Sequence, residues 1–186
     1  MSMQIKTILV PTDFSNNAHV AVEKGCELAR RLGAKLYLLH AQDQSTLRTA
    51  IKKELFDMDA TDELLQTRVM KMVEERFSEL LASLDHTDLE IHSVSLRGDP
   101  KSLVTQYASE INADLVVIGM RGITAASRLV STVIGSVTEH VMRSSPCPTV
   151  VVRLDHEPWL KQQLIASGVD ALTTLHNGHT SLFQQP

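Results

Sequence analysis

The sequence has no long apolar run, few cysteines and no excess of basic residues, and each shortage excludes a class of protein. No stretch approaches the ~20 apolar residues of a membrane span, and no apolar run follows the first lysine, so we expect no signal peptide. Cys26 and Cys147 lack a CxxC partner, which is typical of inert packing in a reducing compartment. A formal net charge of −4 argues against nucleic-acid binding. We expect a cytoplasmic protein with no membrane or nucleic-acid partner.

Motifs that would identify an enzyme are also missing. There is no Gly-x4-Gly-Lys-Ser/Thr loop, so the lysine that usually offsets charge on a transferred phosphate is absent. No Ser/His/Asp or Cys/His set stands out by spacing, and we assign no catalytic residue. His176 and His179 have helical ligand spacing but no acidic or cysteine partner, so we assign no metal site. His40 ends an apolar strand and is expected to be a core residue with its hydrogen bonds satisfied.

The sequence does contain an alternation of apolar strands and amphipathic helices over its 186 residues, enough for one domain. Residues 89–96 alternate and then change phase, which predicts an edge strand with a bulge. Continuous apolar runs, typical of parallel strands covered on both faces, occur at residues 8–10, 36–40, 114–119 and 149–154. Helical patterns occur at residues 18–32, 44–58, 61–84, 100–111 and 136–145. Gly33 is expected to end the first helix, and Asp99-Pro100 is expected to start the fourth as a cap and a first-turn proline. This order predicts a three-layer α/β/α sandwich with a parallel sheet.

Two of these strands end in small or acidic residues and pass into a helix. The first is followed by Pro11-Thr12-Asp13-Phe14-Ser15, where Pro11 ends the ladder and Ser15 can cap the helix. The second is followed by Gly119, Gly122 and then Gly135. Two such ends side by side in a parallel sheet form a pocket for a ribose and its phosphates.

The glycines have a physical role in such a pocket. Without a Cβ, the backbone N–H groups of Gly119 and Gly122 can approach a phosphate closely, and Gly135 allows a sharp turn into the next helix. The alternative is that the glycines serve only turns and close packing. Further candidates for the phosphates are the amides of Val137 and Thr138, and the side chains of Arg121 and Arg128, unless those arginines are solvated.

Two polar side chains have alternative roles within their own turns. Asp13 can accept hydrogen bonds from ribose hydroxyls, or it can pair with its own backbone. Ser136 can contact a phosphate, and Ser136-x-x-Glu139 also has the form of a capping box. In that box the Ser136 hydroxyl accepts from the Glu139 amide, and the two roles do not exclude each other.

These elements and motifs resemble the universal stress protein family over residues 3–154. The ATP-binding branch of that family carries the pattern Gly-x2-Gly-x9-Gly-Ser/Thr. Gly119-Met-Arg-Gly122 and Gly135-Ser136 match its two halves, but twelve residues stand where the pattern has nine. The resemblance implies a Rossmann-like five-stranded parallel sheet of order 3-2-1-4-5 in a domain of residues 1–154. Residues 155–186 would then form a C-terminal extension, partly helical or disordered.

The resemblance also implies a ligand, namely ATP, or ADP or AMP, with or without Mg²⁺. In the family, the positions of Pro11, Thr12 and Asp13 line the ribose and adenine. The Ala41 backbone would face the adenine and Ile118 would lie near the base, although core packing explains both residues equally well. By the same resemblance, the Ser136 hydroxyl or amide would contact the nucleotide.

Three functions follow as hypotheses. The first is a nucleotide-binding module in the stress response that acts through a conformational or partner-binding change, with at most slow hydrolysis. The second, motivated by the three extra loop residues, is an interaction protein of the same fold that binds no nucleotide. The third, an adenylate-using enzyme, needs a lysine or histidine over the α-phosphate that the sequence does not place. Family members commonly dimerise through the last strand, so we expect a homodimer through Thr149–Val152 and an unknown protein partner. The alternative is that a helix in the tail covers this edge or extends the contact.

Overall fold

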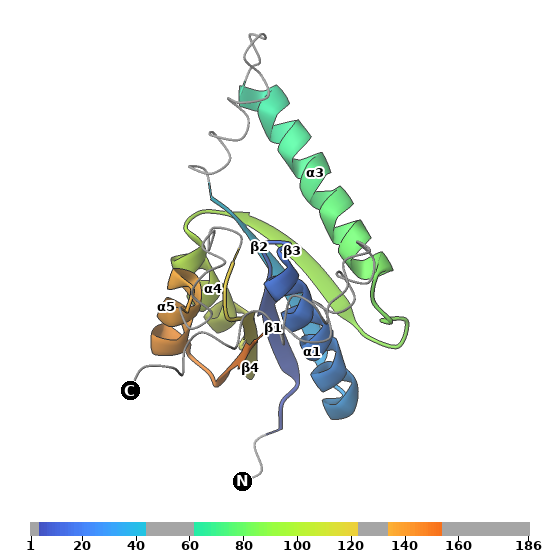
Figure 1. The fold of residues 1–186 in the computed structure, drawn as a ribbon, viewed down its shortest axis with the longest axis vertical. Helices are drawn as coiled ribbons and strands as arrows, with labels where there is room; N and C mark the ends of the chain where they lie inside the picture. Colours follow the sequence, from blue (N-terminus) through green and yellow to red (C-terminus); the bar gives the residue numbers. More distant parts are fainter. Residues whose placement is uncertain (1–3, 44–61, 123–133, 154–186) are drawn as a thin grey trace, which may run out of the picture. The chain divides into compact units, whose positions relative to one another are not determined.

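The sheet has five parallel strands in the order β3-β2-β1-β4-β5 (Figure 1), as predicted. The computed structural model describes residues 4–43, 62–122 and 134–153, which belong to one compact unit, Met1–Arg153. The strands are β1 (Thr7–Pro11), β2 (Lys35–Gln42), β3 (Ile91–Arg97), β4 (Leu115–Gly119) and β5 (Thr149–Val152). Because all strands run in one direction, their carboxyl ends share one edge of the sheet.

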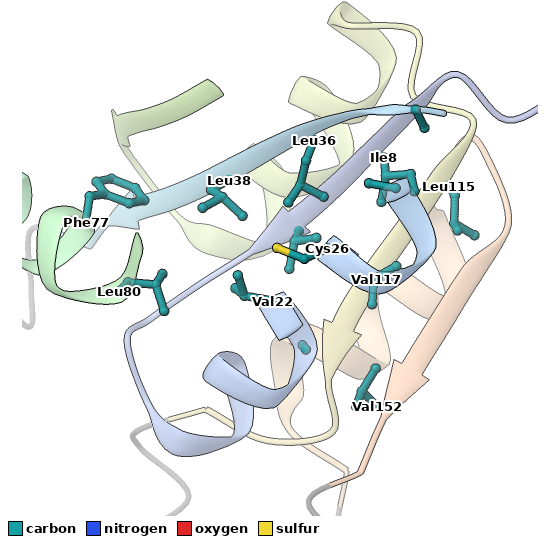
Figure 2. Close-up of a cluster of buried hydrophobic side chains, with 14 of the residues drawn as sticks. Ile8, Val22, Cys26, Leu36, Leu38, Phe77, Leu80, Leu115, Val117 and Val152 are labelled. Carbon is teal, nitrogen blue, oxygen red and sulfur yellow. The ribbon is translucent and has the colours of Figure 1, made fainter. Parts of the chain in front are cut away.

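Helices cover both faces of this sheet, so the predicted three-layer sandwich is confirmed. Ile8 of β1 and Leu36 and Leu38 of β2 point to the face that α1 and α3 cover (Figure 2). Val10 of β1 belongs to the same cluster of buried residues. Leu9 points to the opposite face, where it packs with residues of α4 and α5. The described helices are α1 (Asn16–Leu32), α3 (Asp62–Ala82), α4 (Pro100–Glu110) and α5 (Ser136–Ser144).

Local signals in the sequence set the ends of two helices. The Ser15 hydroxyl accepts from the Ala18 amide at the start of α1, and Gly33 ends that helix in the left-handed conformation at φ 64°. Asp99 caps α4, whose first residue is Pro100. The caps predicted at these positions are confirmed.

The predicted bulge in β3 is wrong. The pairing of β3 with β2 is continuous from Leu36↔Ile91 to Gln42↔Arg97. The apparent change of phase arises because this edge strand packs apolar side chains on both faces. Ile91 packs against the α1–α3 side, whereas Val94 and Leu96 pack against the α4–α5 side.

Several sequence predictions lie outside the described residues. These are the helix at residues 44–58, Arg128, the pair His176 and His179, and the extension from residue 155. Within the described part of the chain, no helix is both long and apolar enough to cross a membrane.

Candidate functional site

The ends of β1 and β4, predicted to lie side by side, meet at the carboxyl edge of the sheet. β1 pairs directly with β4, and the chain continues from β1 into Thr12 and Asp13. The Asp13 carboxylate lies against Gly122, so a Cβ added at Gly122 would overlap Oδ2 of Asp13. The Asp13 carboxylate, which follows β1, therefore lies next to the backbone of Gly122, which follows β4.

The turn from β1 into α1, residues 12–15, is held by its own side chains. The Phe14 amide donates to Thr12 Oγ1 at 3.1 Å, and the Ser15 amide donates to Asp13 Oδ1 at 3.0 Å. Both bonds are partly buried. The local role foreseen for Asp13 is therefore real, and it uses one carboxylate oxygen while the other faces Gly122.

Close packing explains why no side chain fits at Gly119. A Cβ there would stand 2.7 Å from the backbone oxygen of Asn17 in the first turn of α1. The end of β4 thus abuts the start of α1, which brings the two strand ends together. Part of the glycine pattern serves packing, as the alternative interpretation held.

The chain segments on either side of residues 123–133 are tied to each other. The Gly135 amide donates to the Met120 carbonyl at 2.9 Å. The Thr138 hydroxyl donates to the Gly119 carbonyl at 2.8 Å in a buried bond. These bonds place the start of α5 beside the end of β4, whatever the length of the loop between them.

The predicted capping box at the start of α5 is wrong. Gly135, not Ser136, is the N-cap, and no side chain caps the helix. The Glu139 amide donates to the Gly135 carbonyl at 2.9 Å. Because this amide is bonded within the helix, it does not donate to the Ser136 hydroxyl as the box requires. The Ser136 side chain is exposed and is not used as a cap.

The other predicted site residues lie around this edge with different exposure. Ala41, near the end of β2, is half-buried and pairs with Leu96. Ile118 is 5% exposed and belongs to the core under α4 and α5, as the core interpretation held. Of the rest, Pro11, Arg121 and Val137 are half-buried, whereas Thr12 and Thr138 are buried.

Two features of this edge, one contact and one backbone conformation, were not predicted. His40, at the end of β2, bonds through Nδ1 to the Thr12 carbonyl at 2.9 Å. Phe14 has a left-handed backbone at φ 60°, which is uncommon for an aromatic residue. The sequence places His40 at a strand end, but no local signal marks its partner or the Phe14 conformation.

Titratable groups here are shifted mainly by burial. Burial lowers the pKa of His40, and the bond to the Thr12 carbonyl and the charge of Asp13 only partly oppose this. Burial also raises the pKa of the Cys26 thiol, despite the nearby positive charge of Arg30. A cysteine with a raised pKa in the core is a poor nucleophile. In the described segments, no three His, Cys, Asp or Glu side chains are grouped to hold a metal ion.

A parallel sheet of order 3-2-1-4-5 with helices on both faces and polar strand ends defines a doubly wound α/β protein. The model of the universal stress protein family matches residues 4–153. The chain belongs to the universal stress protein family, which confirms the resemblance seen in its sequence.

Individual relatives agree with this assignment. The chain is 30% identical over 154 residues to a protein of Staphylococcus aureus (strain USA300) named as a universal stress protein, covering 82% of this chain and 87% of that one. Universal stress protein UspA from Lactobacillus plantarum has a similar structure, with a TM-score of 0.58 and 25% identity over 82% of this chain and 100% of that one. A universal stress protein solved in complex with cAMP has a TM-score of 0.52 and 21% identity, covering 81% and 98%.

Proposed function

We propose that this universal stress protein binds an adenine nucleotide, ATP or else ADP or AMP, at the carboxyl edge where β1 and β4 meet. The observation that carries the proposal is the placement of the Asp13 carboxylate against the bare backbone of Gly122. A carboxylate can accept from a ribose hydroxyl pair, and a glycine backbone can approach a phosphate closely. A Cβ at Gly122 would fill this space.

The start of α5 supplies a second set of donors. Its first amides have no partner within the helix and its dipole favours an anion. The Thr138–Gly119 and Gly135–Met120 bonds hold this helix start beside the end of β4, from which the chain continues to Gly122. The residues proposed to line the site are Pro11, Thr12, Asp13, Ala41, Ile118, Gly119, Arg121, Gly122, Gly135, Ser136, Val137 and Thr138.

A protein of the same fold that was solved with cAMP supports the ligand class, because it shows that this fold accommodates an adenine nucleotide. For this chain the argument depends on its own residues. Nucleotide held mainly by backbone amides has no base positioned for hydrolysis, so we expect at most slow turnover. The output is then a change of conformation or of partner binding that follows nucleotide occupancy, with or without Mg²⁺.

The first experiment compares wild type with Gly122→Val in isothermal titration calorimetry with ATP, ADP and AMP. We expect wild type to bind with micromolar affinity and Gly122→Val to bind at least about tenfold more weakly, because the added side chain collides with Asp13. Ser78→Val is the control. It introduces the same side chain at an exposed position on α3, outside the proposed site.

The outcomes separate the proposed function from its alternative. If wild type retains none of the three nucleotides at millimolar concentration, the protein is an interaction module of the same fold. If Gly122→Val binds as tightly as wild type, the site is elsewhere. Hydrolysis products that form rapidly above a no-protein control would favour an adenylate-using enzyme.

The edge strand β5 supports a homodimer as the second part of the proposal. Within the described residues, β5 pairs only with β4, and Val150 on this strand is 42% exposed. An apolar edge strand tends to pair with another chain unless it is guarded. We therefore expect two copies to associate through antiparallel pairing of Thr149–Val152.

A further inference from the structure

The turn from β1 into α1 receives a hydrogen bond from the neighbouring strand β2. His40 Nδ1 lies 2.9 Å from the Thr12 carbonyl oxygen. A carbonyl can only accept, so Nδ1 carries the proton. Because burial lowers the pKa of His40, the ring is neutral near pH 7, with its proton on Nδ1. The bond therefore fixes one tautomer.

The imidazole ring of His40 makes a second contact with the same turn. Its centroid lies 4.6 Å from that of Phe14, and Phe14 packs edge-on against Phe77 of α3 at 5.1 Å. Phe14 has φ 60°, a conformation that residues with a Cβ rarely keep unless their surroundings enforce it. The Thr12 hydroxyl accepts from the Phe14 amide at 3.1 Å and so helps to stabilise this backbone conformation.

The geometry points to His40 as a positioning residue for the nucleotide site, an inference that rests on the proposed function. By donating from Nδ1 to the Thr12 carbonyl, His40 holds the turn so that the Asp13 carboxylate stands beside Gly122 before any ligand arrives. A turn that is already ordered loses less conformational entropy when the ligand binds. The hydrogen bond, rather than the ring contact with Phe14, carries this effect.

Two variants distinguish the effect of the Nδ1–H donor of His40 from the effect of its ring contact with Phe14. His40→Phe keeps an aromatic ring against Phe14 and removes the donor. His40→Asn removes the ring and keeps an N–H at the position of Nδ1. We expect His40→Phe to raise the Kd for ATP about tenfold in calorimetry, whereas His40→Asn stays within about threefold of wild type. Wild-type affinity in His40→Phe, or equal losses in both variants, would overturn the inference.

A matched control comes from β3. His92 stacks on Tyr37 at 4.7 Å, and its partner atom at 2.9 Å is a Glu90 carboxylate oxygen, away from the turn. His92→Phe makes the same substitution in the same sheet and should leave ATP affinity unchanged. A loss in His92→Phe as large as in His40→Phe would show a general effect on the sheet and would also overturn the inference.

A second measurement needs no nucleotide, so it remains decisive even if wild type binds none and the proposed function fails. Amide hydrogen exchange by NMR reports whether the turn opens. In the nucleotide-free protein we expect the Phe14 and Ser15 amides to exchange about tenfold faster in His40→Phe, with His40→Asn close to wild type. The Val116 and Val117 amides of β4 should not change in any variant. Unchanged exchange at Phe14 and Ser15 in His40→Phe would refute the positioning role.

Discussion

The hydroxyl of Thr138 ties the end of β4 to the start of α5 by a single buried hydrogen bond. Thr138 is 3% exposed and its hydroxyl donates to the Gly119 carbonyl at 2.8 Å. In the interior, a polar group that loses its partner costs more free energy than the bond itself contributes. The bond joins the chain segments on either side of residues 123–133, so it supports the candidate site as well as the fold.

Thr138→Val preserves the shape of the side chain and removes the donor. We expect the free energy of unfolding in urea to fall by about 1–3 kcal/mol, because the Gly119 carbonyl loses this donor inside the protein. Thr105→Val is the control, since Thr105 is only half-buried and its hydroxyl bonds to the carbonyls of Ser102 at 3.0 Å and Lys101 at 3.4 Å within the same helix. Its effect should stay within about 0.5 kcal/mol. Equal losses in the two variants would contradict this account.

At the scale of the elements, the Asp99 carboxylate caps the start of α4, and the stability that this cap contributes depends on pH. Asp99 Oδ2 accepts from the Ser102 amide at 3.1 Å and from the Ser102 hydroxyl at 2.7 Å. The Ser102 hydrogen bond is the largest cause that holds the pKa of Asp99 below its ordinary value. A carboxyl with a lowered folded-state pKa stabilises above its unfolded pKa and loses that stabilisation as pH falls through the folded one.

Asp99→Ala should therefore destabilise the protein by about 1 kcal/mol at neutral pH. That difference from wild type should shrink as the pH falls from about 5 to about 3, because protonated Asp99 loses the charge that strengthens the cap. Asp99→Asn caps without a charge, so its own difference from Asp99→Ala should vary much less with pH. Unfolding free energies from urea titrations across this range test the prediction. A constant gap between wild type and Asp99→Ala would count against it.

For the helices and strands, local sequence signals predicted some features and missed others. Asp99-Pro100 and Gly33 mark helix ends through their own conformational preferences, so the predictions there are confirmed. The start of α5 at Ser136 was predicted, but its cap was not, because the Glu139 amide donates to the Gly135 carbonyl and no side chain caps the helix. The bulge in β3 was wrongly predicted because an edge strand that packs side chains on both faces breaks the alternation.

At the scale of the whole molecule, the proposed homodimer depends on the edge strand β5. β5 lies at one end of the sheet and exposes Val150. Lysine on an edge strand is a common means by which proteins prevent edge-to-edge pairing. A lysine introduced at position 150 can therefore test whether the proposed homodimer forms through this edge.

In sedimentation velocity, wild type should behave as a dimer and Val150→Lys as a monomer. Met70→Lys is the control, because Met70 is 54% exposed on α3, a helix that is not part of the β5 edge of the sheet. It should leave the dimer intact. A form that ends at Leu154 should also dimerise if β5 alone makes the contact. A monomeric wild type would remove the dimer from the proposal.

The sequence by itself determined the layers and the order of elements, because apolar runs, helical spacing, Gly33 and Asp99-Pro100 act through nearby residues. It also placed Asp13 and Gly122 at strand ends that a parallel sheet must bring to one edge. Only the tertiary structure decided that the Asp13 carboxylate meets Gly122 and that His40 bonds to the Thr12 carbonyl. Those contacts depend on the register of neighbouring strands and on a strained Phe14 backbone, which residues distant in the chain impose together.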